Sequence, residues 1–214
     1  MCENVLNIDI FMMCDKINKK AFVNLSNEYY IRNLKTSELE IWKKLPYYEY
    51  GYTEKDNENM SKLYKLLYGK NEELFYKKCL VVCNKKDEII GTGFLWRSYD
   101  NQINSVHWLK VIPEYENKGI GRALLSILFK NTVNCDMPIY LHTQTGSYRA
   151  IKLYSDFGFK ILTDKKIGQV NNNISVCREI LKKYIPIEHY KKLKYTKAPK
   201  NFLKISEMYE HKEI

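Results

Sequence analysis

The sequence lacks any uninterrupted apolar run near the roughly 18 residues that a membrane-spanning helix requires. Nine Gly and five Pro among 214 residues are too few for a collagen-like or Pro/Gly-rich disordered chain. The first residues, MCENVLNIDIFMMCDK, lack the basic start and continuous apolar core of a secretory signal peptide. We therefore expect a globular protein of the reducing cytoplasm that has no membrane partner.

Cysteine pairs at metal-binding spacing are also missing. The six cysteines include no CxxC pair, and a zinc site would require tighter spacing and histidine partners. Cys79 and Cys83 lie on one face of an expected strand, which is typical of small buried side chains. We therefore expect free thiols and no bound metal.

Arginine is scarce in an otherwise basic chain. Only five of the 35 basic residues are Arg, and against 25 acidic residues the net charge is +10. Arg is suited to bidentate contacts with phosphate and guanine, whereas Lys spread along a chain is typical of a solvated surface. The composition does not favour a nucleic-acid partner, although a small polyanion needs only two or three of these charges.

The hydrophobic pattern alternates between strands and helices. It predicts strands over 29–34, 79–83, 88–96, 105–112 and 138–144. Helical spacing predicts helices over 37–45, 59–77, 120–128 and 147–157, and a hairpin is expected from 159–167 and 174–181. Residues 1–28 are ambiguous, with a helix or strand near 5–13 and a strand near 20–25. We expect an α/β domain over 29–181, an N-terminal extension over 1–28 and a basic C-terminal extension over 182–214.

Local signals refine these elements. Ser37 and Glu40 have capping-box spacing, and Pro46 ends the helix that they start. Ser147 is a plausible N-cap and Gly158 a plausible C-cap of a later helix. Between 182 and 200 the chain has seven Lys and one Glu, which predicts an extension folded on the surface or partly mobile. A role of this extension in an interface or in substrate binding is the alternative.

The most informative segment runs from Val111 to Leu125, VIPEYENKGIGRALL. A strand enters a Pro-bearing turn, and two glycines then open an amphipathic helix. The first turn of a helix has unpaired N–H groups and partial positive charge, and glycine lets an anion approach the backbone closely. Lys118 and Arg122 add full charges. The segment therefore predicts a cradle for a phosphate or pyrophosphate.

Two better-known phosphate motifs do not fit this segment. A Walker A loop would end in GK[ST], whereas Gly121 is followed by Arg122 and Ala123. A dinucleotide fingerprint would need a third small residue at Leu124 and an acidic residue closing the next strand. The remaining alternative is that the glycines only shape a turn.

Together with a second block, this segment resembles the GNAT family of acetyl-CoA-dependent N-acetyltransferases. Residues 111–121 follow the family pattern V-x-P-x-x-[QR]-x-x-G-x-G, and residues 147–159 follow N-x-x-A-x-x-L-Y-x-x-x-G-F. The blocks occur in the family's order, and the resemblance covers 29 to about 181. It implies an α/β fold with a mixed, mostly antiparallel central sheet flanked by helices and splayed between its fourth and fifth strands.

The resemblance also implies acetyl-CoA as the co-substrate. The backbone of Leu109, Lys110 and Val111 would bond its pantetheine arm. The pyrophosphate would be held by Glu116, Asn117, Lys118, Gly119, Ile120, Gly121 and Arg122, and Ser147 would belong to the same site. Glu116 stands where Gln or Arg is usual, and Ser147 where Asn is usual. A carboxylate beside a pyrophosphate is unfavourable, so we expect Glu116 to face solvent or to pair with Lys118 or Arg122.

The reaction implied is direct attack of a primary amine on acetyl-CoA through a tetrahedral intermediate. It needs a proton donor for the leaving thiolate and an acceptor for the ammonium proton. Tyr154 matches the family's general acid, and a tyrosine with a pKa of about 10 keeps its proton at pH 7. The alternative is that Tyr154 is one more ring on the apolar face of its helix.

The candidate base is His107, on the strand that leads into the glycine loop. Period-two alternation places it on one face with Ser105, Leu109 and Val111, and its imidazole suits proton transfer. The position resembles that of a catalytic histidine in arylalkylamine N-acetyltransferases. Glu49, Glu54, His142 or no dedicated base are the alternatives.

A tyrosine-dense segment, PYYEYGY over 46–52, is the candidate acceptor site. Tyr48 and Tyr50 offer ring faces to apolar or cationic groups and hydroxyls for hydrogen bonds. We therefore expect an N-acetyltransferase acting on a small-molecule or peptide amine, with a possible homodimer as its assembly. A non-catalytic acyl-CoA-binding protein and a nucleic-acid-associated basic protein are the alternatives.

Overall fold

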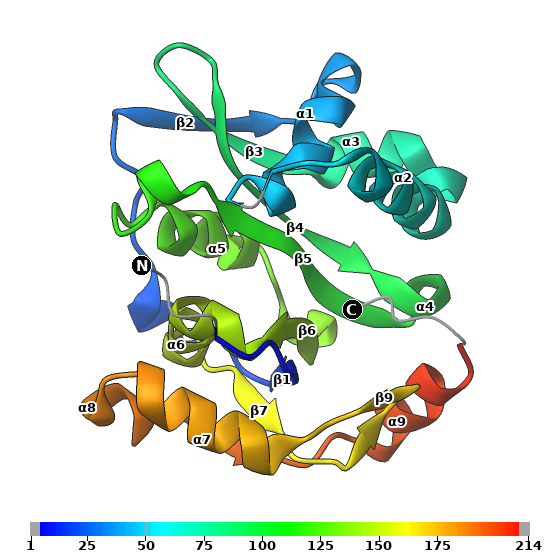
Figure 1. The fold of residues 1–214 in the computed structure, drawn as a ribbon, viewed down its shortest axis with the longest axis vertical. Coiled ribbons are helices and arrows are strands. Elements are labelled where there is room, and N and C mark those ends of the chain that lie inside the picture. The colour runs from blue at the N-terminus through cyan, green and yellow to red at the C-terminus, as the bar shows by residue number, and fades with distance from the viewer. Residues whose placement is uncertain (1–4, 50, 210–214) are drawn as a thin grey trace. The chain divides into compact units, whose positions relative to one another are not determined.

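The computed structural model describes residues 5–49 and 51–209, so the predicted substrate residue Tyr50 lies outside the described residues. The chain forms two compact units, each drawn from separated parts of the sequence. The first unit comprises Met1–Ala21, Arg97–Ser105 and Val133–Ile214, and the second comprises Phe22–Trp96 and Val106–Thr132. Figure 1 traces the chain through both.

The second unit contains strands in the order β5-β4-β3-β2 (Figure 1). These are β2 (Tyr29–Asn33), β3 (Leu80–Asn84), β4 (Ile89–Arg97) and β5 (Ile103–Val111). The last residue of β4 and the first three of β5 belong to the first unit. The pairs β2–β3 and β3–β4 are antiparallel. The four predicted strands of this part of the chain are therefore confirmed to within two residues.

Four helices of the second unit supply its core, namely α1 (Leu39–Lys44), α2 (Glu54–Tyr68), α3 (Glu72–Lys78) and α5 (Ile120–Lys130). Aromatic side chains dominate it, because Trp42, Tyr68 and Phe75 are buried against one another and against Phe94 of β4. The Trp42 and Phe75 rings meet edge to face with centroids 5.2 Å apart. Such pairs stabilise a core beyond the apolar area that they bury.

Three local predictions for these helices are wrong. The expected helix over 59–77 is two helices, α2 and α3, separated by a 3-10 turn at Gly69–Asn71, and glycine is unfavourable inside a helix. The turn before α1 is held by Glu38, which accepts from the Lys35 N–H, and not by Ser37 and Glu40. On α5, helical spacing predicts an apolar stripe of Ile120, Ala123, Leu124, Ile127 and Leu128, but Ile127 is exposed and Phe129 is buried instead.

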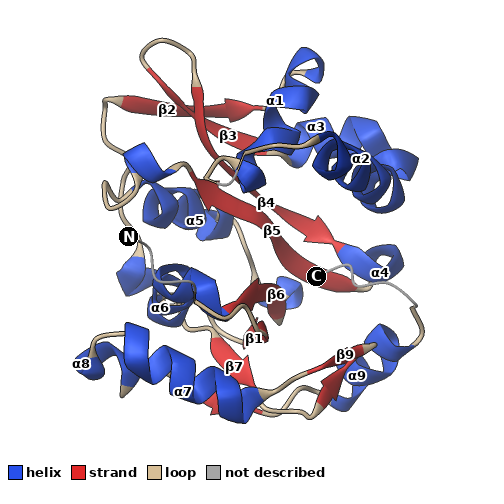
Figure 2. Ribbon diagram, in the orientation of Figure 1, coloured by secondary structure: helices blue, strands red, loops and turns tan. Residues whose placement is uncertain are grey.

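The first unit contains strands in the order β10-β7-β1-β6, followed by the beginning of β5. These are β1 (Asp9–Cys14), β6 (Ile139–Gln144), β7 (Lys160–Leu162) and β10 (Tyr195–Thr196), shown as red arrows in Figure 2 where they are visible. Strand β1 is antiparallel to both β6 and β7. The parallel pairing of β5 with β6 comprises Asn104–Ile139 and Ser105–Tyr140. The chain therefore has the mixed, mostly antiparallel sheet and the flanking helices that were expected.

Strand β1 resolves the ambiguity of residues 5–13. Its apolar run, Ile10 to Cys14, is buried throughout because neighbouring strands flank it on both edges. The strand expected near 20–25 is not formed, and a 3-10 turn, Lys19–Ala21, lies there instead. The N-terminal segment thus supplies an inner strand of the first unit.

The helices of the first unit are α4 (Ser98–Asn101), α6 (Tyr148–Asp156), α7 (Ile174–Tyr184), α8 (Ile187–Tyr190) and α9 (Lys200–Glu207). The expected hairpin strand over 174–181 is wrong, because this segment is α7. Cys177 and Leu181, four residues apart, are both fully buried on one face of it. The small hairpin that does form joins β8 (Lys166–Ile167) to β9 (Val170–Asn171).

The basic C-terminal segment packs as part of the first unit. The seven Lys side chains between 182 and 200 are exposed, whereas Leu193, Ala198 and Phe202 are buried. The Phe202 ring stacks on Tyr140 of β6 with centroids 4.0 Å apart, and β10 pairs with β7. The segment is therefore amphipathic, with charge toward water and apolar side chains in the core. Among all described residues, no helix has the length and apolar character needed to cross a membrane.

An ion-pair network fixes the edge strand β2 of the second unit. Arg32 forms a bidentate pair with Glu38, with N···O distances of 2.7 and 2.8 Å, and a further pair with Asp87 at 2.9 Å. Tyr30 also donates to Asp87, whose backbone is left-handed in the β3–β4 turn. The Arg32 hydrogen bonds lower the pKa of the Glu38 carboxyl below its ordinary value. The network therefore fastens β2 to the hairpin next to it.

Replacing Arg32 with Met should lower the free energy of unfolding by about 2 kcal/mol at pH 7, because Glu38 loses its charged partner while half shielded from water. A carboxyl with a lowered folded pKa stabilises the fold above its unfolded pKa, and this stabilisation is lost as the pH falls. The difference between Arg32→Met and the parent should therefore shrink below about pH 4. Urea unfolding at pH 7 and at lower pH measures it. Lys77→Met, which removes an exposed pair with Glu73, is the control and should change little.

Candidate functional site

The loop between β5 and α5 turns through two left-handed residues. Strand β5 ends at Val111, and a 3-10 turn, Pro113–Tyr115, follows. Asn117 then has φ +60° and Gly119 has φ +77°. Gly119 is the N-cap of α5, and the first bond of the helix runs from the Ala123 N–H to the Gly119 carbonyl at 2.9 Å. The N–H groups of the first helical turn therefore have no partner inside the helix.

The start of α5 has the donor set that a pyrophosphate requires. No described side chain caps this helix, and its first turn carries Arg122 and no acidic residue. A Cβ on Gly119 would have no described atom within 4 Å, so the backbone is open to a ligand at this point. Backbone N–H groups and partial positive charge at an uncapped helix start stabilise phosphate oxygens. The observed geometry fits the cradle that the two glycines predicted.

The charged side chains of the loop have defined surroundings. Lys118 is exposed, and its ammonium lies 4.6 Å from the centroid of the Tyr115 ring. The Tyr115 hydroxyl accepts from the Asn84 side chain at 3.1 Å, which ties the loop to the end of β3. Glu116 is half-buried. Its predicted role at the cofactor stays a prediction.

Strand β5 changes its side-chain alternation at Trp108, whose φ is +52°. His107 lies beside Phe94, with ring centroids 5.6 Å apart, whereas Leu109 lies beside the position that a Cβ on Gly93 would take. Phe94 and Gly93 are consecutive residues of β4 and so face opposite sides of the sheet. The expectation that His107 shares a face with Leu109 is therefore wrong. A left-handed residue between them has shifted the alternation.

Tyr68 of α2 links His107 to Trp108. The Tyr68 hydroxyl lies 2.6 Å from Nδ1 of His107, and the Trp108 indole N–H donates to the same hydroxyl at 2.9 Å. Tyr68 is fully buried and His107 is 6% exposed. Sequence reasoning missed Tyr68, although Met60, Tyr64 and Tyr68 fall at i, i+4 and i+8 and are the buried side chains of α2.

Two tautomers of His107 fit its contact with Tyr68. An indole N–H can only donate, so Tyr68 accepts from Trp108, and its hydroxyl keeps both a proton and a second lone pair. A neutral imidazole that accepts at Nδ1 carries its hydrogen on Nε2, whereas one that donates from Nδ1 has its lone pair on Nε2. The second tautomer is the one that a base acting through Nε2 requires.

The tyrosine-dense segment is anchored at both ends. Tyr47 and Tyr52 have ring centroids 5.4 Å apart, and the Tyr52 hydroxyl donates to the Asn57 side chain at 3.0 Å. Between them, Tyr48 is 50% exposed, and Glu49 forms an ion pair of 2.8 Å with Lys110 of β5. Glu54, another alternative base, lies exposed in the first turn of α2. Tyr48 thus lies exposed next to Glu49, which is paired with β5.

Tyr154 and Ser147 belong to the first unit. Tyr154 is buried on α6, 5.8 Å from the Phe159 ring centroid, and burial raises the pKa of its hydroxyl above the ordinary value. It therefore keeps its proton throughout the neutral range. Ser147 immediately precedes α6 and is exposed, but its side chain makes no capping bond to a described residue. Ser147 thus occupies the predicted N-cap position of α6, without the capping hydrogen bond from its side chain.

Another histidine, His142 of the first unit, has a carboxylate partner. Nε2 of His142 on β6 lies 2.6 Å from Oδ1 of Asp9 on β1. His142 was among the alternative bases, but Asp9 was not foreseen as its partner. The signal in the sequence was the position of Asp9 at the start of an apolar run. The pair itself could not be predicted, because 133 residues separate Asp9 from His142.

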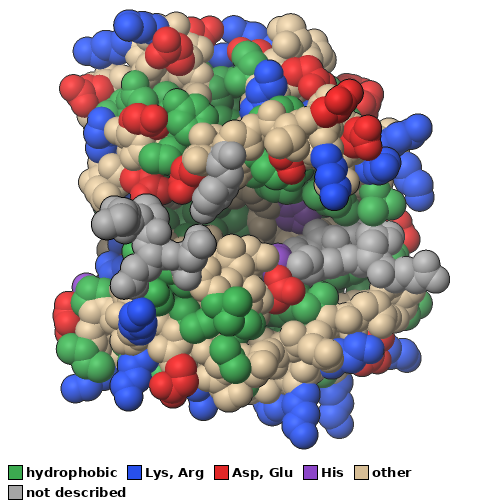
Figure 3. Space-filling view, in the orientation of Figure 1, with side chains coloured by type: hydrophobic (Ala, Val, Ile, Leu, Met, Phe, Trp, Pro, Cys, Tyr) green, Lys and Arg blue, Asp and Glu red, His purple; other side chains and the backbone are tan. Residues whose placement is uncertain are grey.

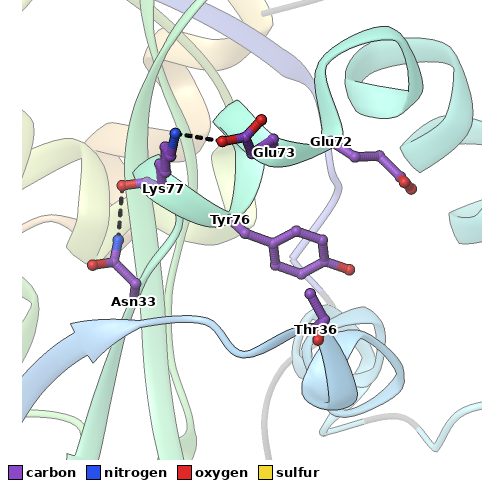
Figure 4. A pocket seen from close by; sticks show the side chains of 6 residues that line it. All are labelled: Asn33, Thr36, Glu72, Glu73, Tyr76 and Lys77. Carbon is purple, nitrogen blue, oxygen red and sulfur yellow. Dashed lines mark hydrogen bonds and ion pairs between the residues drawn. The ribbon is translucent and has the colours of Figure 1, made fainter.

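A shallow hollow of the second unit lies where α3 meets the end of β2 (Figure 4). It is lined by Asn33, Thr36, Glu72, Glu73, Tyr76 and Lys77. Glu73 is paired with Lys77, and the Asn33 amide donates to the Lys77 carbonyl at 2.8 Å. The second of these bonds joins α3 to β2. None of the residues predicted to bind cofactor or substrate lines the hollow. The hollow is explained as the surface groove where α3 packs next to the end of β2.

The surface charge is dispersed. On the face shown in Figure 3, Lys and Arg side chains lie among acidic, apolar and uncharged ones and form no single patch. Most of the excess charge is carried by Lys, as the sequence shows. This distribution accords with the solvated surface expected from the composition.

A family profile identifies the family of this chain. The profile of the acetyltransferase (GNAT) family matches residues 36–159. A GNAT-family acetyltransferase from Colwellia psychrerythraea superposes with a TM-score of 0.50 at 17% identity, over 73% of this chain and 53% of that protein. A GNAT-related N-acetyltransferase from Sphaerobacter thermophilus gives 0.49 at 12% identity, over 74% and 49%. This chain thus spans about half the length of these two proteins.

One further solved structure is shorter. Spermidine N-acetyltransferase from Vibrio cholerae, in complex with CoA and spermine, gives a TM-score of 0.45 at 20% identity, over 69% of this chain and 89% of that protein. A comparison with curated protein sequences found no match. The structural likenesses therefore bear on the fold, while the sequence profile bears on the family.

Replacing Tyr68 with Phe should lower the free energy of unfolding by about 1–3 kcal/mol, because Nδ1 of His107 and the Trp108 N–H both lose the hydroxyl that they contact. ¹⁵N NMR of the imidazole nitrogens should show a change in the tautomer populations of His107 between parent and variant. Tyr64→Phe, on the same helix face, is the control and should leave the His107 signals unchanged. Unchanged His107 signals in Tyr68→Phe would contradict the expected effect of this contact.

Proposed function

The chain belongs to the acetyltransferase (GNAT) family, and on this premise we propose that it moves an acetyl group from acetyl-CoA to a primary amine of a small molecule or peptide. The observation that carries the proposal is the uncapped start of α5 behind the left-handed Gly119. This geometry supplies backbone donors for a pyrophosphate. A domain that shared the fold but bound no such cofactor would not need these donors.

The residues proposed to hold acetyl-CoA lie along the end of β5 and the following loop. We propose that the N–H groups of Ile120, Gly121 and Arg122 bind the pyrophosphate, with Glu116, Asn117, Lys118 and Gly119 shaping the loop. The backbone of Leu109, Lys110 and Val111 would bind the pantetheine arm, and Ser147 would complete the site. When bound, acetyl-CoA supplies an activated acyl group as a thioester.

Two side chains are proposed to serve the chemistry. Tyr154 stays protonated because burial raises its pKa, so its hydroxyl can donate to the leaving thiolate. His107 is proposed as the base that takes the ammonium proton, acting through Nε2 in the tautomer in which Nδ1 donates to Tyr68. The amine then adds in a direct attack through a tetrahedral intermediate.

The acceptor amine is proposed to bind at Tyr48 and Tyr50. Tyr48 is 50% exposed, and the next residue in the sequence is Glu49. The segment therefore carries an exposed aromatic ring and a carboxylate on neighbouring residues. Aromatic faces and carboxylates both attract cationic groups. This pairing supports an amine that is charged in solution and not a neutral alcohol as the acceptor.

Acetyl-CoA and CoA should bind the full chain in the micromolar range by isothermal titration calorimetry, and ATP should not. Lys118→Glu should weaken acetyl-CoA binding about tenfold, because a charge beside the pyrophosphate is reversed. Lys130→Glu, at the exposed opposite end of α5, should leave it unchanged. Equal loss in both variants would show a general charge effect, and no binding by the parent would remove the basis of the proposed function.

Tyr154→Phe should reduce kcat by roughly 10²- to 10⁴-fold while acetyl-CoA binding is retained, because only the proton donor is removed. Tyr184→Phe, a tyrosine stacked on Tyr148 in the same unit, is the control and should keep full turnover. Steady-state assays with a panel of primary amines measure both. Acetyl-CoA binding without turnover by the parent would support the alternative, an acyl-CoA-binding protein without activity.

A further inference from the structure

Tyr115 attaches the loop before α5 to the turn between β3 and β4. It ends the 3-10 turn Pro113–Tyr115 and is half-buried. Its hydroxyl lies 3.1 Å from Nδ2 of Asn84, and its ring meets the Tyr29 ring edge to face with centroids 5.9 Å apart. All of these residues belong to the second unit. The position of the Tyr115 ring is therefore fixed from two sides.

The side chain of Asn84 has all of its hydrogen-bonding positions occupied. Oδ1 accepts from the N–H groups of Lys86 at 2.9 Å and Glu88 at 3.1 Å. Nδ2 donates to the Glu88 carboxylate at 2.6 Å and to the Tyr115 hydroxyl. Backbone N–H groups can only donate and an ionised carboxylate can only accept, so the amide has one orientation. Tyr115 thus accepts from a donor that cannot turn away.

The ring that Asn84 fixes is the one beside Lys118. The Lys118 ammonium lies 4.6 Å from the centroid of the Tyr115 ring, within the range of a cation–π contact. A lysine side chain is long and loses rotamer freedom when it binds a ligand. A ring that already holds the ammonium removes part of this cost before the ligand arrives.

The backbone of the loop brings this charge to the start of α5. Asn117 and Gly119, on either side of Lys118, are both left-handed. The chain therefore turns sharply after Tyr115, and the Lys118 side chain reaches the ring three residues before it. Gly119 is the uncapped N-cap of α5, so the held ammonium belongs to the same short loop as the unpaired backbone donors.

We propose that Tyr115 is a positioning residue that holds Lys118 at the pyrophosphate site, and that Asn84 sets the Tyr115 ring for this purpose. This inference rests on the proposed function. The contacts run from the β3–β4 turn through Asn84 and Tyr115 to Lys118. None of these side chains is assigned to the reacting atoms, so their effect should fall on the affinity for acetyl-CoA and not on kcat.

The first test is isothermal titration of the full chain with acetyl-CoA. Tyr115→Leu should weaken binding about two- to fivefold, while kcat at saturating acetyl-CoA is unchanged. In a Lys118→Met background the same replacement should cause no further loss, because the ring acts through Lys118. Tyr115→Phe keeps the ring and should keep most of the affinity. Tyr76→Leu, a half-buried tyrosine on α3 of the same unit, is the control and should bind as the parent does.

The second test needs no cofactor. In NMR spectra of the parent, the methylene protons next to the Lys118 ammonium should be shifted upfield by the ring current of Tyr115. The shift should vanish in Tyr115→Leu. It should shrink in Tyr115→Phe, because the ring has lost its bond to Asn84. Thermal melting of each variant establishes that it is folded.

The outcomes separate this inference from the proposed function. Unchanged acetyl-CoA binding by Tyr115→Leu, or equal weakening with and without Lys118, would overturn the inference and leave the proposed function intact. Absence of the upfield shift in the parent would also overturn it, even if Tyr115→Leu does not fold. A full shift in Tyr115→Phe would overturn the role of Asn84. A parent that binds no acetyl-CoA would overturn the proposed function and this inference together.

Discussion

The left-handed backbone at Trp108 is the constraint on which the second unit depends. A bulky residue with positive φ inside a strand costs on the order of 1–3 kcal/mol, so it persists only where its surroundings hold it. Here the indole N–H donates to Tyr68, and the ring packs on Trp42 with centroids 5.6 Å apart. The buried aromatic core and the shape of β5 therefore stabilise each other.

This constraint has consequences on both sides of the strand. Because the alternation shifts at Trp108, His107 and Trp108 both reach Tyr68, whereas Leu109 turns toward α5. The strand then leads into the loop whose left-handed residues leave the first turn of α5 uncapped. A costly backbone conformation and an anion cradle thus follow one another along a single stretch of chain, and Tyr68 of α2 contacts the first.

The two histidines show how partners decide chemistry. Both have the same intrinsic imidazole, but a phenol faces Nδ1 of His107 and a carboxylate faces Nε2 of His142. A phenol can donate or accept, whereas an ionised carboxylate can only accept, so the two partners constrain the two rings differently. The partners come from α2 and β1, segments far from either histidine in sequence.

By itself, the sequence determined the strands over 29–111, the amphipathic α5, the two-glycine loop and the family, because these depend on local periodicity and on a contiguous motif. It did not determine that residues 9–14 form an inner strand, that 174–184 form a helix, or that Phe202 in a Lys-rich segment stacks on Tyr140. It pointed to His107 as a base but not to its partner Tyr68. These features were decided only by the tertiary structure, since each arises from a strand edge, a buried face or a hydrogen-bond partner supplied by a distant part of the chain.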